Sequence, residues 1–207
     1  MRIYLYAALL LLSSGSLLAQ ERNFQLGIIG SSQLSYLNSN QGNANTGSAL
    51  LFGFGGLAEY SFADRYAFTS GFEYLNRGGS LEINDTTTDY RAGFIQIPLQ
   101  IKMRTRQFGY STYFAEMGFA IGFETGEEVS WDPATSRDFG SLISLFDATF
   151  RIGMGMEYDL GGQTKLLGRL QYHRALTDNL LSDEDPRLSD QFNYRFDYVS
   201  LSVGILF

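Results

Sequence analysis

Residues 113–124 read YFAEMGFAIGFE, and this stretch decides the fold. Side chains of an extended chain alternate between two faces. One face here is apolar: Tyr113, Ala115, Met117, Phe119, Ile121 and Phe123. The other is mostly small or charged: Phe114, Glu116, Gly118, Ala120, Gly122 and Glu124. The alternation predicts a β-strand, whose apolar face is either the core of a soluble protein or the lipid-facing outside of a membrane barrel.

Composition limits the protein class. The chain has 207 residues, 44% hydrophobic and 15% aromatic, which predicts one ordered domain. The formal net charge of −7 makes a nucleic-acid partner unexpected. Without any cysteine, neither a disulfide framework nor a thiolate metal site can form.

The first twenty residues have the pattern of a secretory signal. Arg2 supplies a positive start, residues 3–12 are apolar, and residues 13–19 are mostly small. We therefore predict a signal peptide at residues 1–20 and a barrel domain at 21–207. A membrane anchor is the alternative, but the apolar run is too short to span. No later run reaches the roughly 18 apolar residues of a spanning helix, so any crossing must use strands.

Alternating segments recur along the chain, separated by links of two kinds. We count eight segments: about 23–37, 48–62, 66–77, 91–104, 111–125, 142–158, 164–174 and 194–206. Short links (63–65, 105–110, 159–163) alternate with long ones (38–47, 78–90, 126–141, 175–193). A barrel that starts on the periplasmic side needs this alternation of tight turns and outer loops. The pattern predicts an all-β fold, an eight-stranded antiparallel up-and-down transmembrane β-barrel.

Glycines and charges on the second face indicate which face meets lipid. A soluble protein has no reason to line its water-facing side with glycine, which weakens strands. A narrow eight-stranded barrel does need small inward residues, because side chains fill its interior. We expect these small residues to point inward: Gly53, Gly55, Gly71, Gly118, Ala120, Gly122, Gly153 and Gly155.

Aromatic residues gather at both ends of the apolar face. Near the short links lie Tyr60, Phe62, Tyr66, Phe68, Tyr113 and Tyr158. Near the long links lie Tyr36, Tyr74, Phe123, Phe146 and Tyr172. Such girdles are typical of membrane barrels, although aromatic residues also favour strands in general.

Residues 93–104 read GFIQIPLQIKMR, and the last ten residues read YVSLSVGILF. Together with a leader ending in AQ, they resemble the PorT-like outer-membrane β-barrel families of Bacteroidota. The resemblance implies an eight-stranded outer-membrane barrel, and some relatives are accessories of a protein secretion system. The terminal Phe207 resembles the sorting signal shown to the barrel-assembly machinery. The expected partners are thus outer-membrane lipid, that machinery and another envelope protein.

Proline has no N–H for a sheet ladder, so Pro98 predicts a bulge or local bend.

Inward-facing charges are expected to pair and fill the bore: Glu59, Glu73, Glu116, Glu124, Asp147 and Glu157 with Lys102, Arg104, Arg151 and Arg169. One group should lie nearer the middle and outer half: Arg151, Arg169, Glu73 and Asp147. The other should gather toward the periplasmic half: Lys102, Arg104, Glu59, Glu116 and Glu157. An ion or proton pathway is the alternative.

Candidate chemistry is sparse. His173, the sole histidine, is expected inside near the outer rim, with no serine or acid beside it in a catalytic motif. The last long link is acidic (Asp178, Asp183, Glu184, Asp185, Asp190) but lacks the spacing of a calcium loop. We therefore predict no catalytic, cofactor-binding or metal-binding residues, and no cofactor.

Three functions fit this sequence. The leading interpretation is a small non-enzymatic outer-membrane barrel that acts through loops or turns as a structural, binding or secretion-accessory component. The first alternative is a soluble periplasmic lipocalin-like binder whose apolar face lines a ligand cavity. The second is an outer-membrane lipid-modifying enzyme that uses His173. Because a fold alone does not fix a function, the fold is the firmer part of the interpretation.

Overall fold

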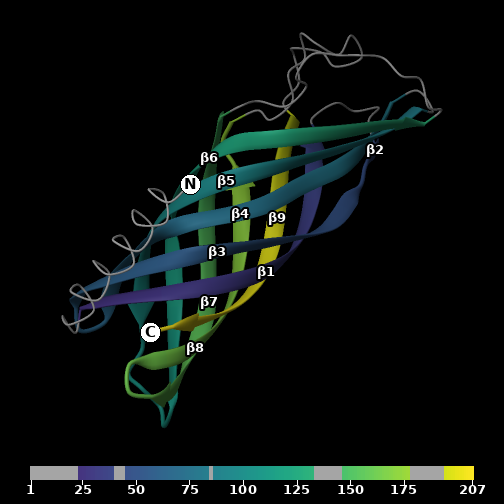
Figure 1. Ribbon diagram of the computed structural model, residues 1–207. Helices are drawn as coiled ribbons and strands as arrows, with labels where there is room; N and C mark the ends of the chain where they lie inside the picture. The colour runs from purple at the N-terminus through teal and green to yellow at the C-terminus, as the bar shows by residue number, and fades with distance from the viewer. Residues whose placement is uncertain (1–22, 40–44, 84–85, 133–145, 178–193) are drawn as a thin grey trace, which may run out of the picture.

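The computed structural model describes residues 23–39, 45–83, 86–132, 146–177 and 194–207. Eight long antiparallel strands and one short strand account for almost all of them (Figure 1). The strands are β1 (Phe24–Ser39), β2 (Asn45–Thr46), β3 (Ser48–Ala63), β4 (Tyr66–Ile83), β5 (Thr86–Arg104), β6 (Ser111–Asp132), β7 (Phe146–Gly161), β8 (Thr164–Ala175) and β9 (Tyr194–Leu206).

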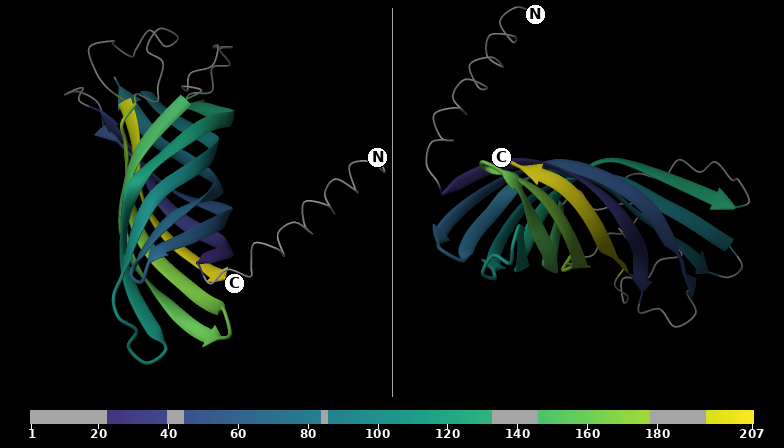
Figure 2. Two further views of the ribbon diagram at one scale, coloured as in Figure 1. Left: turned by 90° about the vertical axis from the view of Figure 1, so that its left-hand side faces the viewer. Right: turned by 90° about the horizontal axis from the view of Figure 1, so that it is seen from below.

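The long strands close into a cylinder. Their order is β4-β3-β1-β9-β8-β7-β6-β5, and β5 pairs again with β4. The first and last strands meet through an antiparallel ladder from Gly27↔Leu206 to Ser39↔Tyr194. Figure 2 shows the strands slanting around the cylinder, with the C-terminus at the end that carries the short turns. The predicted eight-stranded barrel is confirmed.

Within these described ranges, no helix is long and apolar enough to span a membrane.

Three strands run further than the sequence predicts. The expected long link at 78–90 is wrong, because β4 continues to Ile83 and β5 begins at Thr86, with a ladder up to Ile83↔Thr86. Likewise, β6 reaches Asp132 inside the expected link 126–141. Strand β2 adds to the same region by pairing with β4. These strand ends project together beyond the other strands (Figure 1).

The two faces of the sheet are divided as residues 113–124 predict. Met117, Phe119 and Ile121 on β6 are 52%, 55% and 38% exposed on the outside. Glu116, at 2%, is buried in the lumen. The glycines also face inward: a Cβ on Gly155 would lie 2.4 Å from the ring of Phe114, a lumen side chain. The barrel is therefore apolar outside and polar inside.

Aromatic side chains mark both ends of the outer surface. All six expected near the short turns are exposed, and Phe62 stacks on Tyr66 with ring centroids 6.2 Å apart. At the other end Phe123 packs edge-on against Phe146 at 6.0 Å. Tyr36 and Tyr74, also expected there, are half-buried. The aromatic positions agree with the expected girdles.

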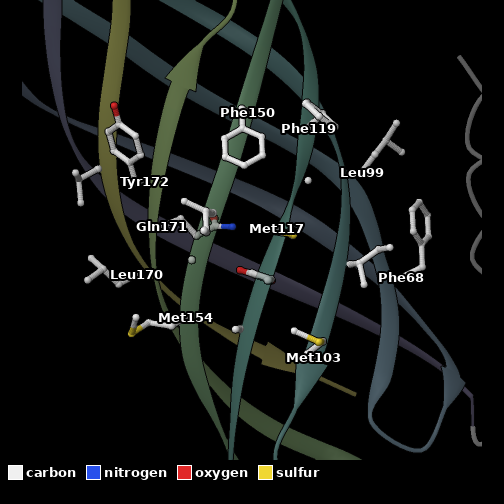
Figure 3. Close-up of a pocket in the computed structure, with 17 residues that line it drawn as sticks. Phe68, Leu99, Met103, Met117, Phe119, Phe150, Met154, Leu170, Gln171 and Tyr172 are labelled. Carbon is white, nitrogen blue, oxygen red and sulfur yellow. The ribbon is translucent and has the colours of Figure 1, made fainter.

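A shallow apolar groove crosses the outside of the barrel between these aromatic ends. It has a volume of about 1060 Å³ and extends from β4 to β9. Figure 3 shows Leu99, Met117, Phe150, Met154 and Leu170 around it. Flexible methionines can adapt to irregular apolar neighbours. This outer surface suits contact with hydrocarbon chains.

Pro98 disturbs one of its two ladders. On the β6 side it pairs in register with Ala120, so a bulge at Pro98 is wrong. On the β4 side, pairing stops between Thr69↔Gln100 and Glu73↔Gln96 and resumes in the same register. Gly71 lies within this interruption and has a φ of 145°. The predicted local irregularity is therefore confined to the β4–β5 contact.

Gly71→Ala is expected to destabilise the barrel. The positive φ disfavours an L side chain, and a Cβ would lie 2.1 Å from the carbonyl oxygen of Gly56. We expect the free energy of unfolding to fall by about 1–3 kcal/mol, measured by urea titration of the folded protein in detergent. Gly168→Ala is the matched control, because its Cβ would meet nothing within 4 Å. Equal losses in both variants would contradict the steric explanation.

Candidate functional site

The lumen holds two groups of ion pairs. The first, the long-loop cluster, consists of Glu73, Arg77, Asp147, Arg151 and Arg169. Glu73 on β4 accepts hydrogen bonds from Arg151 Nη1 at 2.7 Å and Arg169 Nη2 at 2.6 Å. Arg77, toward the long-loop end of β4, pairs with Asp147 on β7 at 2.8 Å, and both side chains are fully buried. Ion pairs thus connect β4 with β7 and β8 through the bore.

Neutral groups connect and brace the long-loop cluster. Gln96 Oε1 accepts hydrogen bonds from Arg151 and from the Tyr198 hydroxyl, the latter at 3.1 Å. Gln96 Nε2 donates to Asp147 at 3.1 Å. The guanidinium of Arg77 lies over the rings of Phe94 and Tyr198, 4.7 and 4.9 Å from their centroids. Such buried networks are stabilising only when their charges are compensated. Glu116, 3.7 Å from Arg169, supplies the third carboxylate for the three guanidinium groups.

The second group, the short-turn cluster, consists of Glu59, Lys102, Arg104, Glu157 and Lys165. Lys102 Nζ donates to Glu59 at 2.5 Å and to Glu157 at 3.1 Å. Arg104 also pairs with both carboxylates, at 3.3 Å from Glu157. Lys165 reaches Glu157 at 3.2 Å. Two carboxylates are therefore shared by three cations at this end.

The two predicted groups of lumen charges are largely confirmed, but one residue belongs to a different group than expected. Glu116 was expected with the short-turn charges, but its charged partner is Arg169, 3.7 Å away. Arg77 and Lys165 belong to the two clusters, although they were missing from the expected inward charges. Glu124 is only half-buried and forms no ion pair with another described residue. The alternative of an ion or proton pathway stays a prediction.

His173 has a neighbour that sequence reasoning missed. Its Nε2 lies 2.8 Å from Ser200 Oγ on β9, and its ring stacks on Tyr198 with centroids 4.0 Å apart. A catalytic triad needs a third group that orients the histidine from its other nitrogen. No described residue forms a hydrogen bond with His173 Nδ1. Alternation along β9 already placed Ser200 inward, and this was the signal that could have found the contact.

The acidic residues of the last long link, from Asp178 to Asp190, lie outside the described residues, as do residues 1–20 of the predicted signal peptide. Within the described strands and turns, no three His, Asp or Glu side chains form a group that could hold a metal ion.

Comparison with known proteins identifies the family. A family model described as "Outer membrane protein beta-barrel domain" matches residues 18–181. This chain belongs to that family. The family confirms the predicted outer-membrane location, while the narrower PorT-like resemblance stays a prediction. A comparison with curated proteins gives no match.

Solved outer-membrane barrels share the fold. The crystal structure of OprG from Pseudomonas aeruginosa is 11% identical, with a TM-score of 0.61, and the match covers 89% of this chain and 94% of that chain. Neisserial surface protein A is 12% identical, with a TM-score of 0.52, and the match covers 88% and 95% of the two chains. At these identities the similarity shows the fold alone.

The outer-membrane location explains the apolar exterior. The groove of Figure 3 faces the acyl chains of the membrane, because its apolar side chains, such as Met117 and Met154, are exposed on the outside between the aromatic ends. The lipocalin-like alternative is wrong. It requires the apolar face of the strands to line an inner cavity, whereas Phe119 and Met154 are 55% and 66% exposed on the outside.

Proposed function

We propose that this chain is a non-enzymatic component of the outer membrane that binds envelope partners through its loops or turns. The observation that carries the proposal is the ion pairing at two levels of the lumen. The pairs Arg77–Asp147 and Lys102–Glu157 each join side chains of separate strands inside the bore. A barrel filled in this way offers its two ends for recognition rather than an open channel.

The narrower proposal is a secretion accessory, as the PorT-like resemblance implies. The test is a deletion strain, in which the secreted proteins are compared with those of the parent strain. We expect a secretion defect that the full-length gene restores. An unchanged set of secreted proteins would overturn the secretion role. The broader binding role would then be tested by crosslinking. A crosslinker at Tyr110, on a short turn, should capture envelope partners, and a crosslinker at Met117, on the lipid-facing side, is the control.

A lipid-modifying enzyme is the second candidate, and the His173–Ser200 contact favours it. Histidine can activate a serine hydroxyl as a nucleophile. However, His173 and Ser200 are 2% and 3% exposed, and the ring packs against Tyr198 inside the lumen. A lipid ester could not reach Ser200 without displacing these neighbours. The burial supports a structural role for the pair.

His173→Ala and Ser200→Ala should leave function intact. We expect both variants to restore the deletion strain as the wild type does, because the proposed role uses the ends of the barrel. Heat-dependent gel migration would verify that each variant is folded. Loss of complementation by both folded variants, together with loss of ester hydrolysis by the purified protein, would favour the enzyme instead.

A further inference from the structure

A polar cavity opens at the short-turn end of the barrel. It has a volume of about 820 Å³, and its lining includes Gln25, Ser61, Asp64, Arg104 and Lys165. We call it the short-turn vestibule. These residues come from β1, β3, β5, β8 and the turn after β3, so the vestibule is the opening of the lumen at the short-turn end. The short-turn cluster borders it through Arg104 and Lys165.

Both cations at the vestibule have hydrogen-bond capacity left. An ammonium group has three N–H donors, and Lys165 uses two, toward Glu157 at 3.2 Å and Gln25 at 3.3 Å. A guanidinium has five, and Arg104 directs its donors to Glu157, Ser61 and Glu59. One donor of Lys165 and one on Arg104 Nη1 remain for a ligand, because Arg104 Nη2 is buried against Glu59. The side chain of Lys165 is 29% exposed, so a ligand can reach it.

The charge balance around the vestibule favours an anion. Lys102, Arg104 and Lys165 carry three positive charges, and Glu59 and Glu157 carry two negative ones. Asp64 on the rim adds a negative charge, but the neighbouring exposed Arg65 offsets it. Asp159, opposite Lys165 on the β7–β8 ladder, forms no ion pair with a described residue, and its Oδ1 accepts a hydrogen bond from the Gly161 N–H. The ion-paired cluster itself therefore holds one more cation than carboxylates, next to unused N–H donors. Charge-assisted hydrogen bonds from such donors suit the oxygens of carboxylates and phosphates.

We propose that the short-turn vestibule binds an oxyanion group, a carboxylate or a phosphate, on the side of the membrane that the short turns face. The anion accepts hydrogen bonds from Lys165 Nζ and the remaining N–H of Arg104 Nη1. It belongs either to a free solute or to the chain end of a partner. This inference rests on the proposed function, in which the ends of the barrel bind, and names the chemistry of one end.

Inorganic phosphate and acetate are the probes, titrated calorimetrically into the purified full-length protein in detergent at constant ionic strength. A peptide with a free C-terminal carboxylate, compared with its amide, distinguishes a chain end from a free solute. We expect Lys165→Met to weaken anion binding by about tenfold, since it removes a charged donor. Asp64→Asn should tighten binding about twofold by removing a rim charge.

Arg106→Met is the matched control, because Arg106 is an exposed cation on a turn at the same end but does not line the vestibule. Its affinity for the probes should stay at the wild-type value. The proposal is overturned if the wild type binds neither probe, or if Arg106→Met weakens binding as much as Lys165→Met. Heat-dependent migration verifies the fold of each variant. Anion binding is measured on the purified protein, whereas the proposed function is tested by complementation of the deletion strain. A failure of anion binding is therefore distinguishable from a failure of the proposed function.

Discussion

Replacing Glu73 by glutamine is expected to lower the free energy of unfolding by about 3–5 kcal/mol. Glu73 accepts hydrogen bonds from both Arg151 and Arg169 in the buried lumen. Without its charge, two neighbouring guanidinium groups lose their shared carboxylate, and Glu116 lies near only one of them, at 3.7 Å from Arg169. Removing one partner of a buried ion pair is costly because the other charge remains uncompensated.

Glu124→Gln is the control for this prediction. It removes the same charge from an inward-facing position on β6, but Glu124 is half-buried and forms no ion pair with any residue that the structure describes. We expect a change within about 0.5 kcal/mol, typical of sites without such partners. Urea unfolding of both variants in the same detergent gives the comparison. Similar stability losses for the two would show that the long-loop cluster does not stabilise the barrel.

The two faces of each strand could be predicted because strand alternation has a period of two. A shift of the strand by one residue would move every side chain to the opposite face of the sheet. Because one set of side chains is apolar and the other is small or charged, only one assignment of the two faces fits. This is why Phe119 was correctly placed outside and Glu116 inside. The number of strands followed from the same pattern, since each alternating segment crosses the membrane once.

Strand ends were harder to predict because pairing beyond the membrane depends on neighbouring strands. Gly78, Gly79 and the polar residues that follow have loop composition. In the structure they pair with residues of β5, and β5 in turn pairs with β6 beyond Gly93↔Gly126. Each added pair extends a ladder that already exists. Arg77 is a separate omission: it is the last residue of the expected segment 66–77 and shares the inward parity of Glu73, so alternation could have placed it in the lumen.

The contacts inside the lumen needed the register and the side-chain directions. Lys102 pairs with Glu116 along the β5–β6 ladder, yet its ammonium group reaches Glu59 and Glu157. Long side chains cross to other strands in a narrow bore, so backbone neighbours are not the charged partners. Ser200 and His173 instead meet diagonally on the adjacent strands β8 and β9, where the ladder partners are His173↔Tyr198 and Gln171↔Ser200. Sequence alternation gives the face but not the partner.

Met117→Arg is expected to destabilise the barrel, because it places a charge at the middle of the lipid-facing surface. Met117 lies at the middle of the β6–β7 ladder, which runs from Ser111↔Tyr158 to Phe123↔Phe146, and its side chain is 52% exposed. A cation at mid-depth on the lipid face is expected to cost about 2–4 kcal/mol. The measurement is reversible urea unfolding from phospholipid bilayers, compared with the wild type under the same conditions.

Tyr113→Arg tests whether that cost comes from depth. Tyr113 is on the same strand and face, is 51% exposed, and lies near the short-turn end. There the arginine can extend toward the headgroups, so the expected cost is about 0–1 kcal/mol. Because the two sites have the same exposure and gain the same charge, the difference between them measures burial in hydrocarbon. Equal costs would mean that the apolar band is not centred at Met117, and that the barrel sits at a different depth in the membrane.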